Sequence, residues 1–342
     1  MNQNLFLGIA SAWRLACLAL SLTIVAGCAS LSSGDAAKLT RDEATFELSE
    51  GDKALRAWQF RLAEGHYSSA RELLRKSRHD ARSTPAQAVN PNFNPQLLDE
   101  NARFYETAAR ELAEAEAPVE ARRERLLQAG EEAIAILRTQ NDFLRARDLL
   151  NRLALQAGDA PSLYQIHYWH AQTLLASYDV EEAYQSIEKS VAGAKRLASV
   201  ALPVRTPVLE VLNFQAAVLM RMGNWDAASA IYLRKSIEDK YRDWEWRWMS
   251  DMDREVGLAQ VELARAKAEK ISPRPHLGAA AAHLGTALKL DQGNASNWTM
   301  LAEVEFLLGN SSHACDAAKR ACELGQCAQK DKHNCAATSG AR

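Results

Sequence analysis

The chain has no excess of charge of either sign and no long hydrophobic run. Its 41 lysine and arginine residues are balanced by 43 aspartate and glutamate residues, so the formal net charge of the 342-residue chain is −2. Nucleic-acid-binding domains usually carry a basic excess, so we expect no nucleic-acid partner. The most apolar run, residues 15–26, is too short to cross a bilayer as a helix.

The sequence also lacks the short motifs of common enzyme classes. It contains no His-Glu-x-x-His motif, no Gly-x-Ser-x-Gly motif and no glycine-rich phosphate loop. Ser186 and Lys189 have a Ser-x-x-Lys spacing, but no companion motif follows, and so short a pattern often occurs by chance. We therefore predict that the protein has no catalytic residues and binds no cofactor.

A histidine pair and a cysteine cluster are the two places where a metal could bind. His167 and His170 are three residues apart, but no Asp, Glu or Cys lies on the next helical turn. Four of the six cysteines crowd the carboxyl-terminal end without a Cys-x-x-Cys spacing, and in an exported protein this pattern favours two disulfides over zinc. These cysteines are Cys315, Cys322, Cys327 and Cys335.

The sequence favours a nested pairing of these four cysteines, although it does not fix the connectivity. Cys315 and Cys322 are seven residues apart on one expected helix, which separates their Cα atoms by roughly 10 Å. A disulfide needs Cα atoms within about 7 Å, so these two cannot join each other. We predict Cys322 with Cys327 and Cys315 with Cys335, and Gly325 allows the chain to reverse.

The first 27 residues have the features of a signal peptide. They contain one charged side chain, Arg14, and the apolar run has the length of a signal-peptide h-region. Residues 25–28, Val-Ala-Gly-Cys, resemble the lipobox of bacterial lipoproteins. This resemblance implies cleavage before Cys28 and acylation of Cys28, and Ala29 implies delivery to the periplasmic face of the outer membrane. The alternative is an ordinary signal peptide in which Cys28 is incidental.

From residue 41 to residue 324 the sequence predicts helices almost throughout. Helix-forming residues dominate, and apolar residues recur at three- and four-residue steps, as at Ala146, Leu149 and Leu150. No segment shows the alternation of a strand. We expect an all-α fold, preceded by a flexible tether over residues 28–40 and followed by a cysteine-containing tail over residues 325–342.

The segment 294–324 has the clearest internal pattern of the chain. It predicts two short helices joined at Gly309, with small residues where the helices meet. The pattern resembles the tetratricopeptide repeat, Trp-x2-Leu-Gly-x2-Tyr followed by Ala-x3-Phe. The matching residues are Trp298, Leu301, Ala302 and Ala314, whereas Glu305, Ala318 and Gln326 replace the family's Tyr, Phe and Pro.

Earlier repeats can be traced through the alanine of each second helix. Ala280 lies 34 residues before Ala314, which is the family's repeat length. The other marker alanines are Ala228, Ala183, Ala146 and Ala70, with Gly223, Asn141 and, beside Trp58, Gly65 in the place of turns. The uneven spacing predicts a solenoid of about six degenerate hairpins.

The tetratricopeptide resemblance implies a protein-binding scaffold. In that family the first helices of successive repeats line a concave groove that accepts a peptide or a helix. Carried over by position, the groove residues would include Tyr168, Gln172, Asn213 and Arg221. We expect partners among envelope or secretion-system proteins. The alternative is a small-molecule-binding accessory lipoprotein of a transport system.

Two segments interrupt the repeats. Residues 83–95 contain three prolines and predict a loop, after which residues 99–117 predict an amphipathic helix packed on the first hairpin. Trp244, Trp246 and Trp248 form the densest aromatic cluster. We interpret the cluster as packing between unequal repeats, and the alternatives are an aromatic contact surface or the wall of a ligand pocket.

Overall fold

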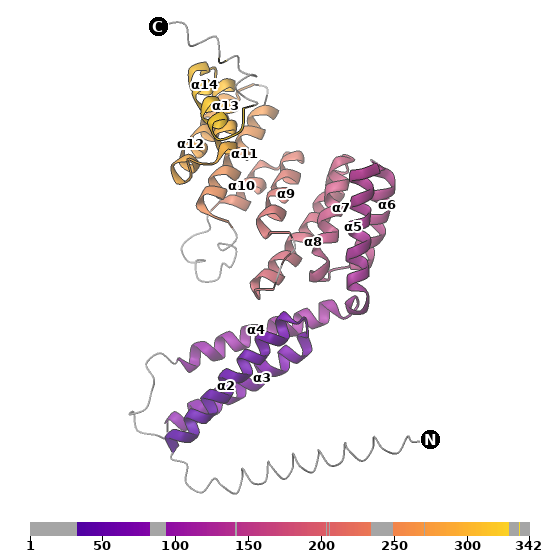
Figure 1. Cartoon of the computed structure of the whole chain (residues 1–342), viewed down its shortest axis with the longest axis vertical. Coiled ribbons are helices and arrows are strands. Elements are labelled where there is room, and N and C mark those ends of the chain that lie inside the picture. The colour runs from indigo at the N-terminus through magenta and orange to yellow at the C-terminus, as the bar shows by residue number, and fades with distance from the viewer. Residues whose placement is uncertain are drawn as a thin grey trace. The chain divides into compact units, whose positions relative to one another are not determined.

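The computed structural model describes most of the chain beyond the proposed signal peptide. The described residues are 33–82, 94–140, 142–202, 204, 206–233, 249–269, 271–327 and 335. Within them the regular structure consists of thirteen α-helices and two short 3-10 helices, with no β-strand, which confirms the all-α fold (Figure 1). Cys28, residues 83–93 of the predicted loop, Trp244, Trp246 and Trp248 lie outside the described residues. Among the described helices, none is both long and apolar enough to cross a membrane.

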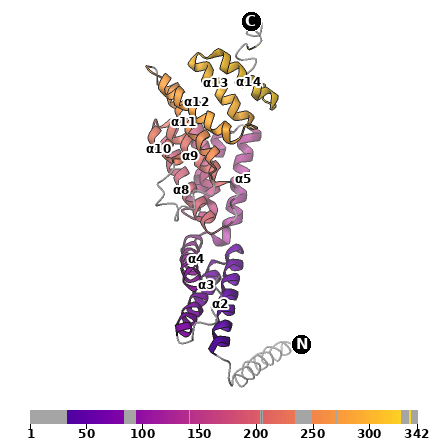
Figure 2. The ribbon, with the colours of Figure 1, turned by 90° about the vertical axis from the view of Figure 1, so that its left-hand side faces the viewer.

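The chain forms two compact units, residues 1–114 and 115–342. The first contains the hairpin of α2 (Ser33–Arg56) and α3 (Phe60–Arg82), together with most of α4 (Pro95–Glu116). The second contains five hairpins, and successive hairpins pack on one another in chain order (Figure 2). The pairs are α5 (Arg123–Gln140) with α6 (Phe143–Ala157), α7 (Tyr164–Ala176) with α8 (Val180–Ser199), α9 (Val208–Arg221) with α10 (Trp225–Tyr232), α11 (Asp251–Ala268) with α12 (Arg274–Leu290), and α13 (Ala295–Leu308) with α14 (Ser311–Glu323).

Each of the six hairpins buries the marker alanine of its second helix. The exposed fraction is 0% at Ala70, Ala146, Ala183, Ala228, Ala280 and Ala314. Four residues later each second helix buries Leu74, Leu150, Ile187, Tyr232, Leu284 or Ala318, and these side chains are at most 1% exposed. The two positions lie on the same helix face, one turn apart. The alanine lets the paired helices approach closely. The side chain four residues later, which is larger in five of the six hairpins, fills the space between them.

Left-handed residues end several first helices of the hairpins. Gly223 and Gly309 have φ values of 74° and 86°, which a glycine adopts without steric cost. Behind Gly309, the N–H of Asn310 donates to the carbonyl of Glu305 at 2.9 Å and satisfies a helix-end acceptor. The turns predicted at these two glycines are confirmed, whereas Asn141 lies outside the described residues.

The turn of the first hairpin is not where the sequence predicted it. Gly65 lies inside α3, and the chain reverses at residues 57–59 instead. There Trp58 takes the left-handed conformation, with φ of 61°, and the N–H of Gln59 donates to Ala54 O at 2.9 Å. The prediction was wrong because it treated glycine as the marker of the turn, while here a tryptophan occupies the position that usually favours glycine.

The predicted tether is also shorter than the sequence analysis placed it. Helix α2 begins at Ser33, so residues 33–40 of the predicted tether are helical, while residues 28–32 lie outside the described residues. Alanine and lysine in this stretch favour a helix intrinsically. Composition rich in small residues therefore misled the assignment of this boundary.

Helix α4 packs on the first hairpin, as the amphipathic pattern of residues 99–117 predicted. Tyr105 of α4 stacks on Tyr67 of α3 with ring centroids 5.5 Å apart. Arg71 of α3 lies between two carboxylates of α4, donating to Asp99 Oδ1 at 3.4 Å and to Glu106. The first unit is therefore a three-helix bundle with an aromatic contact and an ion-pair network between α3 and α4.

Candidate functional site: a groove between α11 and α13

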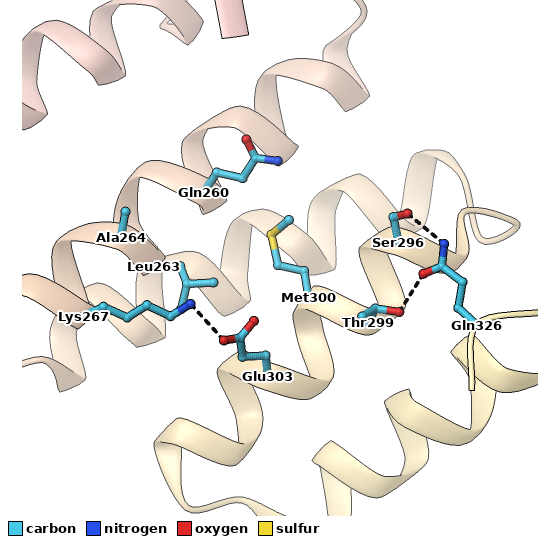
Figure 3. A pocket seen from close by; sticks show the side chains of 9 residues that line it. All are labelled: Gln260, Leu263, Ala264, Lys267, Ser296, Thr299, Met300, Glu303 and Gln326. Carbon is cyan, nitrogen blue, oxygen red and sulfur yellow. Dashed lines mark hydrogen bonds and ion pairs between the residues drawn. The ribbon is translucent and has the colours of Figure 1, made fainter. Parts of the chain in front are cut away.

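A cavity of about 310 Å³ opens between α11 and α13, the first helices of the last two hairpins (Figure 3). Its volume lies at the lower end of the range of about 300–1,000 Å³ that is typical of ligand pockets. On each helix the lining residues follow the i, i+3, i+4, i+7 spacing of a single helix face. They are Gln260, Leu263, Ala264 and Lys267 of α11, Ser296, Thr299, Met300 and Glu303 of α13, and Gln326 from the turn after α14.

The floor of the groove belongs to the hydrophobic core. Leu263 is 7% exposed and lies in a buried cluster with Leu277 and Leu284 of α12 and Val304 of α13. Met300 packs against the same cluster while also lining the groove. Since their inner sides are held by the core, these two side chains form a fixed apolar floor.

A mutual ion pair occupies one end of the groove. Lys267 Nζ lies 2.8 Å from Glu303 Oε1, which joins α11 to α13. Both side chains remain partly exposed, and surface pairs of this kind contribute about 0–1 kcal/mol. The pair stabilises the groove little, but its two charges compensate each other. The groove lining consequently has no net charge.

A neutral hydrogen-bond cluster occupies the other end. Thr299 Oγ1 donates to Gln326 Oε1 at 2.9 Å, and Gln326 Nε2 donates to Ser296 Oγ at 3.1 Å (Figure 3). Gln326 follows Gly325, whose φ of 97° lets the chain turn back from α14 toward α13. The carboxyl-terminal turn thus contributes a wall to a groove that is otherwise built from two helices.

Two disulfides fix this carboxyl-terminal region, with the nested pairing that the sequence favoured. Cys322 is bonded to Cys327 with Cα atoms 4.0 Å apart, and Cys315 to Cys335 with Cα atoms 5.3 Å apart. Cys315 and Cys335 are 3% and 2% exposed, and they pack with Ala302 of α13. The tail therefore extends the core of the last hairpin. Among the described residues no group of His, Cys, Asp or Glu side chains forms a metal-binding cluster.

The groove residues predicted from the sequence lie on other helices. Tyr168 and Gln172 are on α7, Asn213 and Arg221 are on α9, and none of the four lines the α11–α13 cavity. Tyr168 and Asn213 nevertheless share a register with Thr299, because each precedes a fully buried alanine by three residues. These alanines are Ala171, Ala216 and Ala302.

Tyr168 and Asn213, the two predicted residues in that register, are hydrogen-bonded to side chains of neighbouring helices. Tyr168 is 5% exposed, and its hydroxyl donates to Glu210 Oε1 of α9 at 2.8 Å. Burial and this hydrogen bond raise the pKa of Tyr168. Asn213 Oδ1 accepts a hydrogen bond from the hydroxyl of Tyr232 at 2.9 Å. Gln172 is half-buried, whereas Asn213 and Arg221 are exposed. The role of all four residues in binding stays a prediction.

Ser186 and Lys189 do not form a catalytic pair. Lys189 Nζ lies 2.9 Å from Asp159 Oδ1, whereas the Ser186 hydroxyl donates to the backbone carbonyl of His167 at 3.2 Å. Ser186 is only 6% exposed. A buried hydroxyl whose proton is bound to a carbonyl cannot reach a substrate as a nucleophile.

The histidine pair belongs to a buried polar network between α6, α7 and α8. His170 Nδ1 lies 3.0 Å from Ser186 Oγ, and its Nε2 contacts the side chain of Asn151. His167 Nε2 donates to Gly158 O at 2.7 Å. Burial lowers the pKa of His170 to about 4 and also lowers that of His167, so both rings are neutral near pH 7. The network joins three helices and does not resemble a metal site.

The chain matches no protein-family model and no curated protein by sequence. Solved structures that resemble it include a tetratricopeptide repeat protein from Parabacteroides merdae, with 14% identity, 87% of this chain and 100% of that chain covered, and a TM-score of 0.42. YrrB, described as a TPR protein with an unusual peptide-binding site, has 13% identity, coverage of 64% and 96%, and a TM-score of 0.34. The MamA RS-1 ArsTM double mutant has 14% identity, coverage of 58% and 93%, and a TM-score of 0.35.

These scores are low, so the fold assignment rests on the chain's own hairpins. Six helical hairpins with a fully buried alanine in each second helix define a tetratricopeptide-like helical-repeat fold. The transport-accessory alternative predicted a pocket at Trp244, Trp246 and Trp248. These residues lie outside the described part of the chain, so that alternative stays a prediction.

Proposed function

We propose that the protein is a lipid-anchored adaptor that binds proteins of the bacterial envelope through the α11–α13 groove. The observation that carries this proposal is the groove itself, with an apolar floor between hydrogen-bonding side chains. Repeat proteins bind partners on surfaces built from equivalent helices of successive repeats, and α11 and α13 are such helices. The adaptor would act in the assembly of an envelope or secretion complex.

The chemistry of the groove fits an uncharged stretch of extended polypeptide. Leu263 and Met300 offer an apolar surface for one side chain, while the side-chain amide of Gln260 offers a donor and an acceptor for main-chain groups. Because Lys267 and Glu303 already pair with each other, a charged side chain would have to compete with that ion pair. An uncharged segment avoids this competition.

The lipid anchor at Cys28 would place the adaptor on the periplasmic face of the outer membrane. The proposal is supported by the Val-Ala-Gly-Cys sequence and by two disulfides, which form in oxidising compartments such as the periplasm. Acyl chains contribute about 0.8 kcal/mol for each buried methylene, so several chains anchor a protein stably. Metabolic labelling with an alkyne fatty acid should mark the wild type and not Cys28→Ser. Equal labelling of the two proteins would exclude the anchor.

Site-specific photocrosslinking tests the groove. A benzoylphenylalanine at Gln260, which is exposed in the groove, should yield a discrete crosslinked partner in intact envelopes. The matched control carries the same group at Ala282, an exposed residue of α12 outside the groove lining. Partner crosslinks of equal yield from both positions, or from neither position, would place binding elsewhere.

A further inference from the structure

The groove has one wall that no repeat helix supplies. Eight of its lining residues belong to α11 and α13, and the ninth, Gln326, comes from the turn beyond α14. Gln326 is exposed, yet both ends of its amide are bonded to α13, through Thr299 Oγ1 at 2.9 Å and Ser296 Oγ at 3.1 Å. Its position therefore determines how the polar end of the groove is shaped.

The Cys322–Cys327 disulfide encloses the turn that carries Gln326. Within this turn, the N–H of Gly325 donates to Cys322 O and the N–H of Gln326 donates to Ala321 O, each at 2.9 Å. Backbone hydrogen bonds at an exposed helix end open readily. The disulfide joins residues on both sides of Gln326 and holds their Cα atoms 4.0 Å apart. It thereby restricts the turn even when these hydrogen bonds open.

The second disulfide cannot take over this task. Cys315–Cys335 lies in the core between α13 and α14, where both cysteines are buried. Cys327 is exposed, as is Gln326, while Cys322 is half-buried. A reductant thus reaches the Cys322–Cys327 bond more easily than the buried bond, because disulfide exchange requires access to a sulfur atom.

We propose that the Cys322–Cys327 disulfide controls the groove by holding Gln326 against Ser296 and Thr299, so that partner binding is sensitive to thiols. The inference rests on the proposed function of the groove. In the reductive step a dithiol reductant gives two electrons and two protons to the Cys322–Cys327 bond. Two cysteine thiols form, and the dithiol becomes a disulfide. Gln326 then leaves α13, and the polar end of the groove loses its wall.

The first part of the test needs no partner. In the full chain labelled with [15N]glutamine, Gln326→Ala identifies the side-chain amide signal of Gln326. Its hydrogen exchange with water should be at least about fivefold faster in Cys322→Ser/Cys327→Ser than in the wild type, which corresponds to losing one hydrogen bond of ordinary strength. The matched control, Cys315→Ser/Cys335→Ser, should keep the wild-type exchange rate. Equal rates in all three proteins, or faster exchange in both variants, would overturn the proposal.

The second part tests control of binding. Crosslinking from Gln260 should decrease at least about fivefold in Cys322→Ser/Cys327→Ser and in Gln326→Ala, again the factor of one hydrogen bond. An unchanged crosslink in both variants would refute control by the disulfide while leaving the adaptor function intact. If the wild type gives no crosslink, the proposed function fails. The exchange measurement then still decides whether the disulfide holds Gln326.

Discussion

Replacing Gly257 with alanine should disrupt the packing between the third and fourth hairpins of the second unit. Gly257 of α11 faces the ring of Tyr232 of α10, and a Cβ at this position would lie 2.2 Å from two ring atoms. The ring has no room to move, because Tyr232 is 1% exposed and its hydroxyl is bonded to Asn213 at 2.9 Å. The added methyl group therefore has to displace α11 itself.

The expected cost follows from overpacking. Inserting a methyl group into a tightly packed core typically costs about 1–3 kcal/mol. Gly278→Ala is the matched control, since Gly278 lies in α12 and nothing is within 4 Å of the added Cβ. There alanine should stabilise the helix by about 0.4–1 kcal/mol, because it reduces the entropy of the unfolded chain. The same entropic gain applies to Gly257→Ala, so the two variants should differ by the overpacking cost alone, about 1–3 kcal/mol.

Thermal unfolding followed by circular dichroism at 222 nm measures this difference. Both positions lie in the unit of residues 115–342, so both changes affect the same transition. For a domain of 150–250 residues, about 1 kcal/mol shifts Tm by about 2–4 °C, so Gly257→Ala should melt about 2–12 °C below Gly278→Ala. A Gly257→Ala protein that melts at or above the temperature of Gly278→Ala would refute the close contact between α10 and α11.

Three further predictions concern polar side chains. The folded pKa of His170 is about 4, below its ordinary value of 6.5, so the folded state binds fewer protons than the unfolded state between these values. Stability should be full above pH 6.5 and decrease as the pH falls toward 4, and His170→Gln should flatten this dependence in urea titrations at pH 7 and pH 5. Glu116→Ala should lower the free energy of unfolding by about 1–3 kcal/mol, because it leaves the N–H of Ser162, now 2.7 Å from the carboxylate, without its acceptor. An unchanged urea midpoint would contradict this. Asn213→Ala should cost about 1 kcal/mol through its lost bond to a buried tyrosine hydroxyl, whereas Arg221→Ala should stay within about 0.5 kcal/mol. Equal midpoints for these two variants would show that the hydrogen bond between Asn213 and Tyr232 does not stabilise the fold.

The sequence was sufficient to predict the hairpins because their contacts repeat. Each second helix needs a small residue where it meets its partner and usually places a larger one a turn later, as at Ala280 and Leu284. Such a pair is visible even where the spacing between repeats varies. Trp58 shows the limit of this approach. A glycine in the sequence indicates a possible left-handed turn, whereas a tryptophan in the left-handed conformation cannot be recognised from the sequence.

The cavity was not predictable in the same way. Its lining residues are common types such as Gln260, Ala264 and Thr299, and no motif singles them out. Its polar end also depends on Gln326, a residue outside the repeats that reaches α13 only because the chain reverses after α14. A periodic pattern predicts which face of a helix is buried. It does not predict that a tail after the last helix folds back onto an earlier one.

One register of the first helices places different side chains beside different neighbours. The position three residues before the buried alanine of a first helix is Tyr168 in α7, Asn213 in α9 and Thr299 in α13. The tyrosine extends to Glu210 on the next first helix, and the asparagine bonds to Tyr232. Thr299 lines the groove instead, and its Oγ1 lies 2.9 Å from Gln326 Oε1 and 2.9 Å from Ala295 O of its own helix. Sequence reasoning named Tyr168 and Asn213 but not Thr299, because it valued large polar side chains, and the part of Tyr168 and Asn213 in partner binding stays a prediction.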